Sequence, residues 1–173
     1  MIRLAASSVA VVGLALAASL SAAFWLNRLA GPGEAQAAVV VAAPVDPAPA
    51  RGSAAQVVKA ADGHFWTEAD IDGRAVRVMI DTGATVVALT LDDAARLGLR
   101  PNEADFTQTV RTASGPVPAA PVRLDRVSVG RAQVQGVEAL VLKDGLPHSL
   151  LGMSYLGRLS AFEATPTGLT LRP

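Results

Sequence analysis

One carboxylate inside an apolar stretch constrains this chain more than any other feature. Residues 79–90 read Met-Ile-Asp-Thr-Gly-Ala-Thr-Val-Val-Ala-Leu-Thr, so Asp81 interrupts a run that is typical of a buried strand. A buried charge survives only if it is paired, hydrogen-bonded or kept partly neutral, which is the setting of a working acid or base. Gly83 allows a sharp turn beside the carboxylate, and Thr82 adds a hydroxyl that can donate and accept. The stretch therefore predicts a functional loop around Asp81.

The segments around this loop predict an all-β fold. Asp72-Gly73 is typical of a two-residue hairpin turn, here between strands over 65–71 and 74–80. Thr90 with Asp93 is a start signature for a helix over 91–97, which Gly98 ends. Short strands are also expected over 86–89, 127–129, 132–134, 137–142, 150–151, 162–164 and 169–171, and a short helix over 153–159. Gly130 and Gly136 separate the middle strands, and such regular short strands indicate a barrel or a sandwich.

Another extended pair predicts a projecting hairpin. Strands over 107–112 and 117–124 flank the small residues of 113–116, Ala-Ser-Gly-Pro. Pro118 and Pro121 are expected to keep the second strand out of the centre of a sheet. A ribbon of this kind is mobile and suits a lid over a cleft, although an ordinary exposed hairpin has the same pattern.

The first third of the chain predicts a membrane anchor and a tether. Residues 1–29 contain an uncharged apolar stretch between Arg3 and Arg28 that is long enough to cross a bilayer. A cleaved signal peptide is the alternative, because Ala35-Gln36-Ala37 resembles a cleavage site. Residues 30–55 are rich in alanine and proline and predict a linker, and 56–173 form the predicted domain. The charge balance across the anchor favours a single-pass protein with this domain on the periplasmic or extracytoplasmic side.

Composition excludes several kinds of site. The chain has no cysteine, which rules out a thiolate nucleophile and a disulfide framework. His64 and His148 lack metal-ligand spacing, so we expect neither a metal nor another cofactor. The formal net charge is zero and the basic residues are scattered, so nucleic acid is not an expected partner.

Three segments in order resemble the retropepsin-like aspartic proteases, and they are most similar to a bacterial membrane-anchored branch that carries Asp-Thr-Gly-Ala. They are 80–85, then 112–115 with 120–124, then 150–156, within a resemblance that covers 65–173. The resemblance implies a closed acid-protease barrel with one lobe per chain and short helices, which would follow the N-terminal transmembrane helix that the apolar stretch predicts. It makes Asp81 the catalytic aspartate. The implied active-site loop is Thr82, Gly83, Ala84 and Thr85, the implied flap is Thr112, Ala113, Ser114 and Gly115, and the implied support behind the loop is Leu150, Leu151 and Gly152.

The same resemblance implies a homodimer. Aspartic protease chemistry needs one ionised and one protonated carboxylate close together. This chain has one Asp-Thr-Gly, and its Asp-Gly pairs at Asp62, Asp72 and Asp144 read as turns. Two copies of Asp81 meeting across a two-fold axis would complete the site, with a peptide or protein as substrate. A catalytically inactive, membrane-tethered peptide-binding or scaffold protein with the same fold is the alternative.

Overall fold

The computed structural model describes residues 48–112 and 115–173, which all lie in the unit Val45–Pro173. The predicted anchor, residues 1–29, and most of the predicted linker lie outside the described residues. Among the described residues, no helix is both long and apolar enough to span a membrane. The elements are β1 (Ala55–Val58), β2 (Trp66–Ile71), β3 (Arg74–Ile80), β4 (Val87–Leu89), α2 (Leu91–Leu97), the 3-10 helix η1 (Glu103–Asp105), β5 (Gln108–Thr112), β6 (Gly115–Val129), β7 (Ala132–Leu142), β8 (Ser149–Leu151), α3 (Met153–Leu156), β9 (Ala161–Ala164) and β10 (Gly168–Arg172).

Six strands close into a barrel, which confirms the all-β prediction. They follow the order β2-β3-β8-β4-β7-β6, and β6 pairs back onto β2. β5 adds to the outer part of β6 as a hairpin. β8 runs parallel to β3, and β4 runs parallel to β7, while the other pairs are antiparallel. Closure leaves the barrel without a free edge.

The barrel interior is filled by the alternate residues of each strand. On β3, Val76 and Val78 are buried, whereas Arg77 between them is exposed. Tyr155 of α3 lies fully buried in the same core, and its hydroxyl donates a hydrogen bond to the Ala132 carbonyl at 2.8 Å. Burial raises the pKa of Tyr155 to about 12. The alternation of buried and exposed residues along β3 therefore determines which of its side chains, such as Arg77, face outward on the side of the predicted site.

The predicted hairpin turn and the predicted helix limits are both present. Asp72 and Gly73 have φ angles of 51° and 84°, as a two-residue turn with left-handed central residues requires. Thr90 caps α2, because its hydroxyl accepts a hydrogen bond from the Asp93 amide at 3.1 Å. Gly98 ends the helix with a φ of 87°.

The middle of the chain differs from the sequence prediction. β6 and β7 are long strands of 15 and 11 residues, not a series of short ones. Gly136 has a φ of 60° within β7, but the register with β6 is the same on both sides of it. Pro118 and Pro121 lie inside β6, each with one paired neighbour strand, because β5 pairs there with 115–119 and β7 with 119–129. Each proline therefore lies where β6 has a paired neighbour on one side only, although β6 as a whole is not an edge strand.

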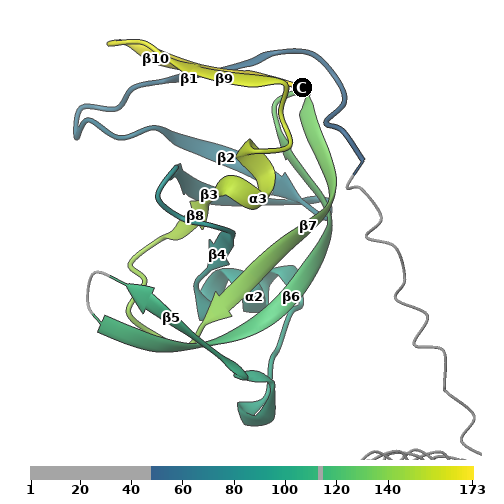
Figure 1. Cartoon of the computed structure of the whole chain (residues 1–173), viewed down its shortest axis with the longest axis vertical. Helices are drawn as coiled ribbons and strands as arrows, with labels where there is room; N and C mark the ends of the chain where they lie inside the picture. The colour runs from purple at the N-terminus through teal and green to yellow at the C-terminus, as the bar shows by residue number, and fades with distance from the viewer. Residues whose placement is uncertain (1–47, 113–114) are drawn as a thin grey trace, which may run out of the picture. The chain divides into compact units, whose positions relative to one another are not determined.

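β1, β10 and β9 form a separate three-stranded sheet in that order. It lies at the end of the unit opposite the β5–β6 hairpin (Figure 1). β10 is the central strand, and Leu169 and Leu171 are buried in the core of their own chain. Before β1, Arg51 pairs with Gln133 of β7 through backbone hydrogen bonds of 2.8 Å. The last part of the predicted linker is thus attached to the barrel.

Candidate active site

Asp81 stands at the end of β3, next to β8. The Asp81 amide continues the parallel pairing of these strands by donating to the Leu151 carbonyl at 3.2 Å. On the other side, the Ile80 amide donates to the Phe65 carbonyl at 2.9 Å. Since Val76 and Val78 point inward, the alternation puts Arg77, Met79 and Asp81 on the outer face of the barrel. Backbone on both sides therefore positions the carboxylate.

The Asp-Thr-Gly loop folds back onto its own aspartate. The Gly83 amide donates to Asp81 Oδ1 at 2.8 Å, and the Ala84 amide donates to the Asp81 carbonyl at 3.3 Å. Within residues 48–112 and 115–173, no donor reaches Asp81 Oδ2, and the Thr82 hydroxyl makes no hydrogen bond. Asp81 and Ala84 are partly exposed, and Thr82, Gly83 and Thr85 are exposed. The loop thus presents a half-satisfied carboxylate to the surface.

Leu150, Leu151 and Gly152 lie directly behind this loop. Leu151 is fully buried between β3 and the core. A Cβ on Gly152 would lie 2.2 Å from the Val86 carbonyl oxygen and 2.6 Å from the Ala84 carbonyl oxygen, so no larger residue fits. The next amide, that of Met153, donates to the Ala84 carbonyl at 2.8 Å. The structure therefore brings the Leu150-Leu151-Gly152 segment into contact with the loop that follows Asp81.

Ser154 lies in the segment 150–156, but its supporting role is not evident from the sequence. Its hydroxyl accepts from the Val87 amide at 2.9 Å and donates to the Glu138 carbonyl at 2.7 Å. It thereby joins the start of β4 to β7, just after the loop. A serine in a short helix carries no signal of partners 67 and 16 residues away.

A buried polar cluster ties α2 to β8. The Ser149 hydroxyl donates to Asp93 Oδ2 at 2.5 Å and accepts from the Thr90 amide at 3.1 Å, and Arg96 is ion-paired with Asp93. Burial acts to raise the pKa of Asp93, but the hydrogen bonds from Ser149 and Arg96 outweigh it, and the pKa is lowered. Ser149 begins the strand that holds Leu151 behind Asp81, so the cluster supports the site indirectly.

The predicted flap is the β5–β6 hairpin. Thr112 and Gly115 are paired across it, and the Thr112 hydroxyl donates to the Gly115 carbonyl at 2.9 Å. Ala113 and Ser114, predicted as its tip, lie outside the described residues. A small apolar cluster on the outer face of the barrel carries the hairpin; its buried members are Ala88, Val117, Ala119 and Leu142, with Val110, Leu140, Leu146 and Leu150 packed against them. The hairpin thus packs beside Leu150, which is paired with Met79, two residues before Asp81.

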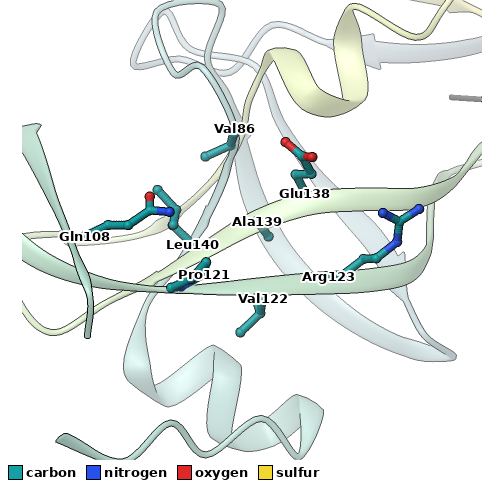
Figure 2. A pocket seen from close by; sticks show the side chains of 8 residues that line it. All are labelled: Val86, Gln108, Pro121, Val122, Arg123, Glu138, Ala139 and Leu140. Carbon is teal, nitrogen blue, oxygen red and sulfur yellow. The ribbon is translucent and has the colours of Figure 1, made fainter. Parts of the chain in front are cut away.

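A hollow of about 450 Å³ adjoins the far end of the loop. Val86 overhangs it, Gln108 of β5 stands at one end, and Arg123 and Glu138 project from β6 and β7 at the other (Figure 2). Arg123 and Glu138 are directly opposite in the β6–β7 ladder. The hollow therefore has one basic and one acidic side chain at the same end.

No cluster of three or more histidine, aspartate or glutamate side chains in the described part of the chain is arranged to hold a metal ion. The chemistry available at the loop is that of a carboxylate, a hydroxyl and backbone amides. A closed barrel with an Asp-Thr-Gly loop, a Leu-Leu-Gly strand behind it and a hairpin on the same face defines an acid-protease type of protein.

Comparison with known sequences agrees with this class. A family model described as gag-polyprotein putative aspartyl protease matches residues 67–158. An uncharacterized protein of Sinorhizobium sp is 42% identical over 115 residues, covering 66% of this chain and 49% of that protein. An uncharacterized protein of Rickettsia prowazekii (strain Madrid E) is 38% identical over 107 residues, covering 62% and 46%. The chain spans about half the length of these curated relatives.

Solved structures give the same result. A retropepsin-like aspartic protease from Rickettsia conorii is 34% identical, with a TM-score of 0.63 over 70% of this chain and 92% of that one. EIAV protease in complex with an inhibitor shares the fold, with a TM-score of 0.50 and 21% identity over 61% and 96% of the two chains. The chain belongs to the retropepsin-like aspartic protease family.

Proposed function

We propose that this protein is an aspartic endopeptidase in which Asp81 of two identical chains activates the water that attacks a peptide bond. The observation that carries the proposal is the half-satisfied Asp81 carboxylate. One oxygen accepts from the Gly83 amide at 2.8 Å, and in the described residues the other has no donor of its own chain. A second carboxylate at that position would share a proton with the first, since two carboxylates held so close do not both ionise.

The reaction then divides between the two copies. The ionised Asp81 takes a proton from water, and the protonated one polarises the carbonyl of the scissile bond. The Gly83 amide stabilises the ionised form, because a hydrogen bond to a carboxylate favours its charge. The β5–β6 hairpin covers the extended substrate and keeps bulk water from the site.

Two features of the surface support a homodimer. Thr82 is exposed beside Asp81, where it can meet its own copy across a two-fold axis. The terminal sheet has β1 and β9 at its edges, and each edge carries an exposed apolar residue, Val58 at 77% and Phe162 at 37%. Apolar side chains and unpaired strand edges together are suited to a protein interface.

We also propose that residues 1–29 anchor the chain in a membrane, with the protease domain on the periplasmic or extracytoplasmic side. Two anchored chains would meet more often than two free ones, which favours pairing. Reporter fusions after residue 47 check the orientation: activity of a reporter that works only in the cytoplasm would contradict it.

The test of catalysis is the Asp81→Asn variant, with Asp125→Asn as the matched control. Asp125 is an exposed aspartate of β6 away from the loop. We expect Asp81→Asn to lower cleavage of a peptide library by about a thousandfold or more, because the amide cannot act as the base, while Asp125→Asn cleaves normally. Equal cleavage by Asp81→Asn and wild type contradicts the proposal. If no peptide is cleaved but peptides bind, the protein is the inactive peptide-binding protein.

A further inference from the structure

A second hollow, of about 430 Å³, lies on the outer face of the barrel near the end of β3. Trp66 of β2, Arg77 of β3 and His148 line it. Met79 pairs with Trp66 on one side and with Leu150 on the other. Asp81 is two positions beyond Met79 and four beyond Arg77, so along the strand Trp66 is roughly 7 Å and Arg77 roughly 13 Å from the Asp81 carboxylate. A long side chain of an extended substrate within about three residues of the scissile bond can therefore reach the hollow.

Trp66 is held in one orientation at this hollow. Its Nε1 donates to Asp62 Oδ2 at 2.8 Å. The His148 ring meets it edge-on at 4.9 Å between centroids, with an interplanar angle of 85°. The Arg77 guanidinium carbon lies 5.0 Å from the Trp66 ring centroid. The result is an apolar ring surface with a positioned cation beside it.

The charged side chains that line this hollow differ in whether they already have an ion-pair or hydrogen-bond partner. Arg96 is ion-paired with Asp93, which also accepts from Ser149. Arg77, in contrast, forms neither an ion pair nor a hydrogen bond with any residue of 48–112 and 115–173. Asp92 is the exposed carboxylate of the lining, and it does not pair with Arg77. The guanidinium therefore presents its N–H donors to whatever enters.

We propose that this hollow is a specificity pocket for an acidic side chain of the substrate. The methylene groups of a glutamate would lie on the Trp66 ring, and its carboxylate would accept hydrogen bonds from Arg77. A guanidinium stacked on an aromatic ring loses little freedom when it binds a carboxylate, so the contact favours binding. This inference rests on the proposed function, because it assigns the pocket to the same substrate cleft.

The cleavage test uses a cleaved peptide in which each of the three residues on either side of the scissile bond is changed in turn to Glu, Gln or Lys. At one position we expect Glu to exceed Gln by roughly tenfold in kcat/KM, as for a charge-assisted hydrogen bond. Arg77→Gln should remove this difference and Arg77→Lys should restore part of it. Asp92→Asn should enlarge it, because a competing negative charge is lost. Arg126→Gln, which removes an exposed arginine far from the hollow in the ladder, should leave it unchanged.

Several results would overturn the pocket: no preference for Glu at any position, a preference for Lys, or a preference that survives in Arg77→Gln. A binding test separates the pocket from catalysis. In the Trp25→Phe, Asp81→Asn chain, Trp66 is the one remaining tryptophan of two, so its fluorescence reports occupancy directly. Tighter binding of Glu than Gln peptides without wild-type cleavage would support the specificity pocket and contradict the proposed protease activity. Equal binding of the two peptides would contradict the pocket whether or not cleavage occurs.

Discussion

Gly152 shows how a single residue controls the geometry of the Asp81 loop. The carbonyl oxygens of Ala84 and Val86 turn toward it, and the first of these also accepts from the Met153 amide. A glycine here lets the backbone of the supporting strand approach the backbone of the loop. The position of Asp81 therefore depends on the absence of a side chain in another part of the sequence.

Gly152→Ala should lower stability by about 1–3 kcal/mol and lower activity further, because the loop must move away from the new methyl group. Chemical denaturation and peptide cleavage measure the two effects. Gly63→Ala is the control: its Cβ would meet nothing within 4 Å, and only its φ of 86° is unfavourable. Full activity in Gly152→Ala would show that the close packing behind the loop is dispensable.

The contact between α2 and β8 determines where the strand behind the Asp81 loop begins. Asp93 and Ser149 form it, and Asp93 is almost fully buried. The pKa of Asp93 is lowered in the folded chain, so its ionised form stabilises the fold above the ordinary pKa of an aspartate. This stabilisation is lost as the pH falls through the lowered value.

Asp93→Asn should therefore cost about 1–2 kcal/mol at neutral pH and progressively less below about pH 4. Unfolding measured between pH 7 and pH 3 gives the difference from wild type at each pH. Asp92→Asn, an exposed change of the same charge in the same helical turn, should show little loss at any pH. A cost for Asp93→Asn that does not change with pH would contradict the role of its charge.

Local signals predicted some elements well and failed where long-range pairing decides. Thr90, Asp93 and Gly98 define α2 by contacts within a few residues, so the sequence was sufficient there. The sequence predicts separate strands over 132–134 and 137–142 because a glycine often interrupts a ladder, and it predicts that Pro118 and Pro121 keep 117–124 out of the centre of a sheet. Pairing over the whole β6–β7 hairpin outweighs both local signals. For the site, the Asp81 loop was visible as a continuous segment. Ser154 was not, since its partners are distant in the sequence.

The terminal sheet and the Asp81 loop both concern how two copies of the chain would pair. Among residues 48–112 and 115–173, β10 has a neighbouring strand on each side, and β1 and β9 are the edges at which a second copy can add. Replacing the exposed Phe162 of β9 by Glu should weaken self-association, because it places a charge at an apolar edge. Sedimentation over a range of concentrations checks this, and activity should fall together with the dimer. Unchanged association would place the interface elsewhere.

Each active site is proposed to contain Asp81 from two chains. Mixing wild type with Asp81→Asn under conditions of subunit exchange tests this proposal. With the wild-type amount constant and an equal amount of the variant added, half of the wild-type chains pair with an inactive partner, so cleavage should fall to about half and continue to fall with more variant. Cleavage that stays constant as the variant chain is added and exchanges would mean that one chain holds a complete site, and would contradict the shared active site.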